Sequence, residues 1–168
     1  MRFHIMPFHF FGGHLKNSRH AFESVGSHIS GYMLQSNTSN STYPLTRVQT
    51  DGFLHPYGHE GTVGAVLNFP GTTQQGCTYP IHNVESLLEA KWAGIYFGLE
   101  MAKRSDQQFI GIESDALAIV RQIMMNDRGD KPYSKYYHSK IKEIGNDLQW
   151  CGVRYIPSEL IYVNKMLE

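Results

Sequence analysis

The chain has 168 residues, enough for one domain, and 41% of them are apolar, so a hydrophobic core can form. The 15 Lys and Arg residues balance 15 Asp and Glu residues, which argues against strong, charge-driven binding to nucleic acid. Two cysteines without metal-binding spacing favour a reducing compartment and free thiols. No stretch approaches the roughly 20 apolar residues of a membrane span, so we expect no membrane segment. We also expect the protein to be a monomer.

Residues 1–44 differ in composition from the rest of the chain. They carry Arg2, Lys16 and Arg19 against a single acid, Glu23, and they end in a polar run over 35–43. Acid-poor, Ser-rich leaders are typical of organellar transit peptides, which would suggest a mitochondrial address. The alternative is an upstream remnant of a longer coding sequence. We therefore expect a low-order leader over 1–44 and a compact domain over 45–168.

Taken in chain order, the first predicted elements are strands. Residues 47–53 form a short strand that ends in Asp-Gly, and the apolar run over 62–69 suits a central strand. Pro70 and Gly71 mark a turn, after which residues 76–81 can return as a hairpin. Residues 84–104 contain no proline and predict a long helix with Asn83 as its N-cap.

The second half of the domain alternates between strand and helix. The pattern predicts a buried strand over 109–114, helices over 116–125 and 135–148, a strand over 153–156 and a short helix over 160–167. Three hairpin-connected strands followed by this alternation imply an α/β fold, a mixed sheet with helices on its faces.

Two aspartates end strands that this topology brings together. Asp51 ends the first strand and Asp115 follows the fourth. A right-handed crossover through the long helix lets these strands lie parallel, about 4.8 Å apart, with both carboxylates at the same edge. Such a pair repels unless a cation lies between the carboxylates, and Mg²⁺ is the obvious candidate. The alternative is that both are ordinary turn residues at strand ends.

Several short motifs resemble one family in their order and spacing. They are residues 47–52 (RVQTDG), 64–67 (GAVL), 89–91 (EAK), 98–102 (GLEMA), 112–116 (IESDA) and 155–159 (YIPSE). Over about residues 44–168 the chain resembles the ribonuclease H-like domains of plant retroelements and their host-encoded relatives. The resemblance implies a five-stranded mixed sheet of order 3-2-1-4-5 and a reverse transcriptase-associated hydrolase that cuts RNA in RNA–DNA hybrids.

Members of that family hold two metal ions with four carboxylates. The resemblance assigns the first to Asp51 and the third to Asp115, so these are the candidate catalytic and metal-binding residues. The other two positions depart from the pattern. The helix motif Glu-Ala-Glu is here Glu89–Ala90–Lys91, and the C-terminal Ala-Asp-x-Leu is replaced by a segment containing Lys165. The chain also stops where the C-terminal helix should continue.

Helix geometry bears on the first departure. At about 100° per residue, Lys91 shares the sheet-facing side of the helix with an apolar set. That set is Val84, Leu88, Ile95, Leu99 and Ala102. Glu89 lies about 160° away, Glu100 about 180° away and Glu85 about 120° away. Lys91 is then either a snorkelling residue or a cation that reaches the aspartates, with Lys165 as a second candidate, and replaces the charge of a metal.

The most basic and aromatic stretch follows Pro132. Lys135, Tyr136, Lys140 and Lys142 are candidate nucleic-acid contacts, since basic residues interleaved with aromatics suit single strands or hybrids. His55, in the loop after Asp51, is a further candidate. The alternatives are a solvated helix face and a polar loop.

Three functional hypotheses remain open. The first is a degenerate ribonuclease H-like domain that binds RNA–DNA hybrid or other nucleic acid weakly and needs no cofactor. The second is an active endonuclease that uses Mg²⁺ or Mn²⁺, with Glu89 as a weaker catalytic candidate beside Asp51 and Asp115. The third is a non-catalytic retroelement remnant or interaction domain.

Overall fold

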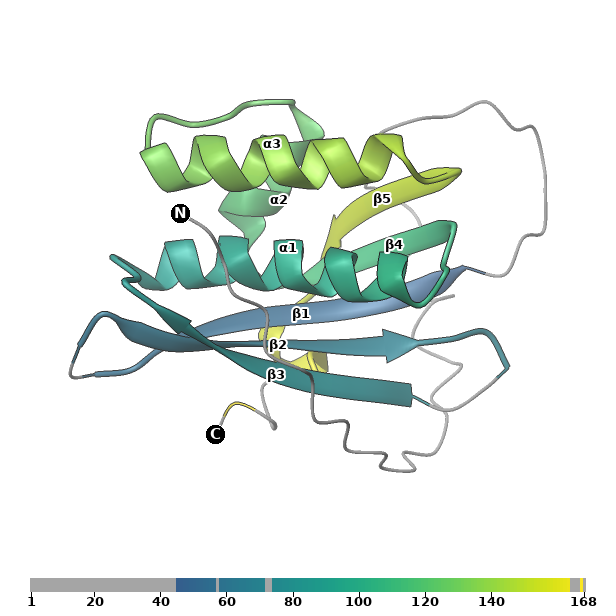
Figure 1. Ribbon diagram of the computed structural model, residues 1–168, viewed down its shortest axis with the longest axis horizontal. Helices are drawn as coiled ribbons and strands as arrows, with labels where there is room; N and C mark the ends of the chain where they lie inside the picture. The colour runs from purple at the N-terminus through teal and green to yellow at the C-terminus, as the bar shows by residue number, and fades with distance from the viewer. Residues whose placement is uncertain (1–44, 57, 72–73, 164–166, 168) are drawn as a thin grey trace.

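A five-stranded mixed sheet forms the centre of the domain (Figure 1). The computed structural model describes residues 45–56, 58–71, 74–163 and 167. Within them the strands are β1 Thr46–Leu54, β2 Glu60–Asn68, β3 Gln74–His82, β4 Phe109–Ser114 and β5 Trp150–Tyr155, in the order β3-β2-β1-β4-β5. β1, β2 and β3 pair antiparallel, whereas β4 runs parallel to both β1 and β5. The predicted mixed sheet and strand order are confirmed.

In the described part of the chain three α-helices accompany the sheet: α1 Leu87–Arg104, α2 Leu117–Met124 and α3 Pro132–Asn146. α1 lies over one face of the sheet, along the direction of the strands, and α3 lies alongside α1 (Figure 1). A 3₁₀ turn, η2 Ser158–Leu160, follows β5. Among the described residues no helix is long and apolar enough to cross a membrane.

The start of α1 differs from the sequence prediction. The helix begins at Leu87, not at residue 84, and Ser86 is its N-cap because its Oγ accepts a hydrogen bond from the Glu89 backbone N–H at 3.1 Å. Glu89 Oε2 in turn accepts from the Glu85 backbone N–H at 2.7 Å. The pattern differs from a standard capping box, in which the glutamate would bond the N–H of the N-cap residue itself. Asn83, the predicted cap, instead has a left-handed φ of 58°.

The end of the domain also differs. In place of a helix from residue 160, the described residues contain η2 and then extended backbone at Ile161. Residues 164–166, which include Lys165, lie outside the described residues, and so does the predicted leader over 1–44.

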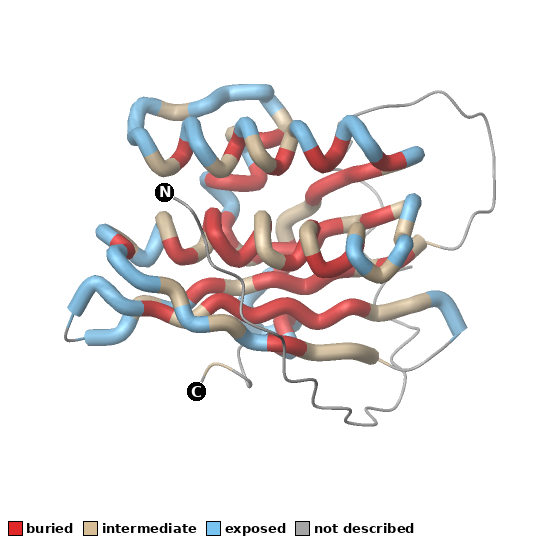
Figure 2. Tube along the Cα trace, in the orientation of Figure 1, coloured by how far each residue is buried: buried red, intermediate tan, exposed pale blue. Residues whose placement is uncertain are grey.

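Buried apolar side chains fill the space between α1 and the sheet, and buried residues run through the central strands (Figure 2). Trp92, Ile95 and Leu99 of α1 are fully buried. Leu88, predicted to share this face, is 40% exposed, and Val84 is buried although it precedes the helix. A smaller cluster of Val66, Ile156, Ile161 and Val163 joins the C-terminal segment to the sheet. Cys77 and Cys151 are buried free thiols, as predicted.

Candidate functional site

The parallel pairing of β1 and β4 brings the two aspartates to one edge of the sheet. Gln49 of β1 is level with Glu113 of β4. Asp51 and Asp115 each lie two residues further along the same direction. This edge is the carboxyl end of β4, where open α/β sheets place their ligands. The prediction that Asp51 ends its strand is wrong, because β1 continues to Leu54 through its pairing with β2.

Two glycines let α1 touch β1 beside Asp51. A Cβ on Gly52 would lie 2.1 Å from the Ala90 carbonyl oxygen, and a Cβ on Gly94 would lie 2.5 Å from the Asp51 carbonyl oxygen. Real Cβ atoms do not approach backbone this closely, so both positions require glycine. The backbone contact places Lys91, the residue after Ala90, next to the aspartate pair.

Lys91 bridges the two carboxylates. Its Nζ lies 3.0 Å from Asp51 Oδ1 and 2.6 Å from Asp115 Oδ1. The side chains are 18%, 13% and 10% exposed for Lys91, Asp51 and Asp115, so water screens the contacts little. Ser158 Oγ donates a hydrogen bond of 2.7 Å to the other oxygen of Asp115. The contact expected between Lys91 and both aspartates is therefore present.

The electrostatics of the cluster favour a charged lysine. Burial raises the pKa of Asp51, and the Lys91 ammonium offsets this effect in part. Burial acts to lower the pKa of Lys91, but the hydrogen bonds and charges of Asp115 and Asp51 outweigh it and leave the pKa raised. Lys91 thus stays protonated at neutral pH and supplies positive charge between two acids.

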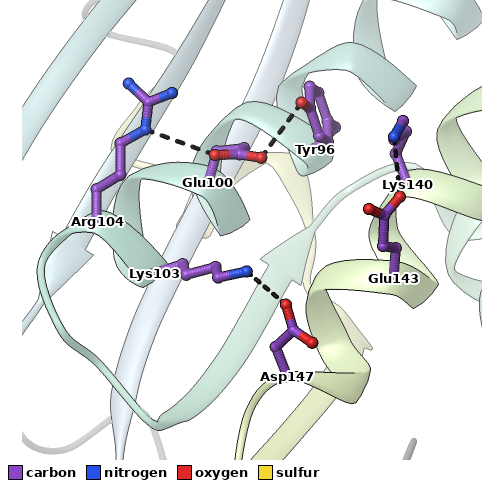
Figure 3. A network of polar contacts seen from close by, with 7 residues as sticks. All are labelled: Tyr96, Glu100, Lys103, Arg104, Lys140, Glu143 and Asp147. Atoms are coloured by element: carbon purple, nitrogen blue, oxygen red, sulfur yellow. Dashed lines mark hydrogen bonds and ion pairs between the residues drawn. The ribbon is translucent and has the colours of Figure 1, made fainter.

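The acidic residues of α1 are engaged elsewhere. The Glu89 carboxylate accepts a hydrogen bond from the Glu85 backbone N–H just before the helix. Glu100 contacts Tyr96 and Arg104 on the helix surface (Figure 3). Across the described residues, no group of three or more His, Cys, Asp or Glu side chains is arranged to hold a metal ion. The donor set there does not fit a two-metal centre of four carboxylates.

The candidate nucleic-acid contacts lie mostly on α3. Lys135 and Tyr136 are exposed, whereas Lys140 pairs with Glu143 at 2.8 Å (Figure 3) and Lys142 donates to Asn126 at 3.1 Å. Figure 3 also shows an ion pair between α1 and the C-cap of α3, in which Lys103 Nζ lies 2.6 Å from Asp147 Oδ2. In the loop after β1, His55 Nε2 lies 3.2 Å from Thr62 Oγ1. A role in binding stays a prediction for all five candidates.

Sequence reasoning missed Ser158 as a member of the site. The signal was present, because Ser158 follows β5, which runs parallel to β4 and ends at the same edge of the sheet. Its contact with Asp115 spans 43 residues of chain. Neither hydropathy nor local spacing reports such a contact.

Comparison with solved structures shows the same fold in ribonuclease H enzymes. RNase H1 from Halobacterium salinarum superposes with a TM-score of 0.66 and 15% identity, covering 73% of this chain and 93% of that one. An N-terminal RNase H domain from Mycobacterium tuberculosis superposes with a TM-score of 0.67 and 14% identity, covering 74% of this chain and 91% of that one. LC11-RNase H1 was solved in complex with an RNA/DNA hybrid. It superposes with a TM-score of 0.61 and 18% identity, covering 73% of this chain and 99% of that one.

At the level of sequence, no curated protein matches the chain. A family model, described as reverse transcriptase-like, matches residues 49–167. These residues include the whole Asp51–Lys91–Asp115 cluster. The chain is a member of the reverse transcriptase-like family and has the ribonuclease H-like fold.

Proposed function

We propose that the protein is a nucleic-acid-binding ribonuclease H-like domain in which a lysine has taken the place of metal-bound charge. One observation carries the proposal: Lys91 Nζ lies within 3.0 Å of Asp51 and 2.6 Å of Asp115. Mg²⁺ would need carboxylate oxygens at about 2.0–2.1 Å, so it competes for the space that the ammonium fills. Binding the ion would require Lys91 to leave both acids.

Charge balance supports the same conclusion. The Lys91 ammonium already offsets half of the negative charge of the aspartate pair, and Ser158 occupies the second oxygen of Asp115. A divalent ion entering this cluster would meet one net negative charge and a nearby ammonium that repels it. We therefore expect weak or no cleavage of RNA–DNA hybrids by a two-metal route.

Nucleic-acid contact has separate support. A neighbour of the same fold, LC11-RNase H1, is solved with an RNA/DNA hybrid. This chain presents exposed Lys135 and Tyr136 on α3. With 15 basic and 15 acidic residues, the chain has no excess charge to strengthen phosphate contact, so we propose weak binding by a monomer. The retroelement origin and the mitochondrial address stay predictions.

A gain-of-binding experiment tests the metal-free site. The wild-type protein should show no Mn²⁺ binding by electron paramagnetic resonance and no Mg²⁺- or Mn²⁺-dependent cleavage of a hybrid duplex. Lys91→Glu should bind Mn²⁺, because it sets a third carboxylate beside Asp51 and Asp115. Adding Asp115→Asn should abolish that binding. Lys131→Glu, which makes the same charge change at an exposed position, is the matched control.

Two outcomes would reject the proposal. Robust hybrid cleavage by the wild type that Asp51→Asn abolishes would show an active endonuclease with a working metal site. Hybrid affinity that stays unmeasurable at low salt, or that does not change with salt, would exclude phosphate contact and leave a non-catalytic interaction domain.

A further inference from the structure

A second polar cluster crosses the sheet next to the aspartates. Gln49, Glu113 and Arg154 are level with one another on β1, β4 and β5. Arg154 donates to Glu113 Oε1 at 2.6 Å, and Gln49 Nε2 donates to Glu113 Oε2 at 3.0 Å. Gln49 and Glu113 are buried, with 7% and 3% of their surface exposed. A buried carboxylate with both oxygens hydrogen-bonded is fixed in orientation.

The Gln49 amide also binds the chain after β5. Nε2 donates to the Leu160 carbonyl oxygen at 3.3 Å, and Oε1 accepts from the Tyr162 backbone N–H at 3.0 Å. A donor and an acceptor facing two alternate residues of one segment imitate the pairing of a neighbouring strand. Glu113 sets which way the amide faces, because an ionised carboxylate only accepts and therefore requires the NH₂ end.

The segment held by Gln49 is the one that carries Ser158. Ser158 Oγ donates to Asp115 Oδ2, two residues before the carbonyl that Gln49 binds. On its other side the segment packs closely on β2, where a Cβ on Gly64 would lie 2.6 Å from Val163 Cγ1. The polar and apolar contacts together fix residues 158–163 against the sheet.

We propose that Gln49 is a positioning residue that orients Asp115 through this segment. Glu113 orients the Gln49 amide, and the amide binds the backbone at Leu160 and Tyr162. The segment held in this way places the Ser158 hydroxyl within hydrogen-bond distance of Asp115. The carboxylate is thereby held with one oxygen toward Ser158 and the other toward Lys91. This role does not depend on nucleic-acid or metal binding, so its test needs neither ligand.

Gln49→Met tests the role, because methionine keeps the length of the side chain and removes its amide. By NMR hydrogen exchange, the Tyr162 amide should exchange roughly 10-fold faster than in the wild type, as expected for loss of one hydrogen bond. The Asp115 ¹³Cγ resonance should move in the same direction as it does in Ser158→Ala. The Gln49→Met/Ser158→Ala double variant should move that resonance no further than Ser158→Ala alone.

Gln108→Met, at an exposed glutamine, is the matched control and should change neither signal. Unchanged protection of the β1 and β4 amides shows that the sheet is intact. An Asp115 resonance that stays at its wild-type position in a folded Gln49→Met protein would overturn the proposal. If that variant does not fold, Gln49→Asn carries the same test, because it keeps the amide but is one methylene too short to reach both backbone groups.

Discussion

Removing the Lys91 ammonium should expose the energetic role of the bridge. In Lys91→Met, Asp51 and Asp115 keep their low exposure of 13% and 10% but lose their shared cation. At 3.0 and 2.6 Å each contact is worth roughly 6 kcal/mol of gross attraction at an effective dielectric constant of about 20. Desolvation offsets most of this, and removing one partner of a buried pair costs about 3–5 kcal/mol. We expect urea unfolding at pH 7 to show a loss in that range.

The loss should depend on pH in a defined direction. Burial raises the pKa of Asp51 above 3.8, and Lys91 opposes that rise, so Lys91→Met raises the pKa further. An acid with a raised folded-state pKa favours folding when protonated, and this advantage disappears as pH rises through the folded pKa. The difference between Lys91→Met and wild type should therefore grow as pH rises above about 4.

Lys131→Met removes an exposed lysine and serves as the control, with an expected change within about 0.5 kcal/mol. Asp51→Asn placed in the Lys91→Met background should recover part of the lost stability, because it removes one unpaired charge. A Lys91→Met protein as stable as wild type at pH 7, with no dependence on pH, would refute the account of a tightly paired, desolvated bridge.

Three further predictions concern the backbone, the cap and the surface. Gly52→Ala should lower the free energy of unfolding by about 3 kcal/mol or more, because the methyl meets a carbonyl oxygen at 2.1 Å, whereas Gly111→Ala, with its nearest neighbour at 3.4 Å, should change it by less than about 1 kcal/mol. Ser86→Ala should lower the free energy of unfolding by about 1 kcal/mol, because it removes the N-cap of α1. Thermal unfolding measures this loss, with Ser139→Ala, an exposed site within α3, as the control. Equal melting temperatures for the two variants would count against the cap. Lys135→Glu should weaken hybrid binding and flatten its salt dependence in fluorescence anisotropy, and unchanged anisotropy would remove α3 from the interface.

The sequence predicted what depends on strand order. Hairpin-connected strands followed by a crossover helix allow β1 and β4 to lie as parallel neighbours, and the structure has this pairing, which brings Asp51 and Asp115 to one edge. Helix periodicity likewise placed Lys91 toward the sheet. Both are properties of regular elements, which hydropathy and spacing report directly.

The predicted start of the long helix was wrong, because two nearby residues are both good N-cap residues. Asn83 is a good N-cap residue, but it is the Ser86 hydroxyl that accepts from the Glu89 backbone N–H, and the helix begins there. That shift leaves Leu88 in the first turn of α1, where it is 40% exposed in spite of its hydropathy. The hydrogen bonds from Gln49 to Leu160 and Tyr162 could not be predicted, because their partners are separated by 111 and 113 positions in the chain.

The direct backbone contact between β1 and α1 has a consequence for how this domain type changes over time. At Gly52 and Gly94 the backbones of β1 and α1 meet directly, and this contact does not involve the side chain at position 91. A substitution at position 91 can thus change the charge beside Asp51 and Asp115 without altering this backbone contact. The packing of the helix and the charge of the cluster are therefore set by different residues, so one can change while the other is kept.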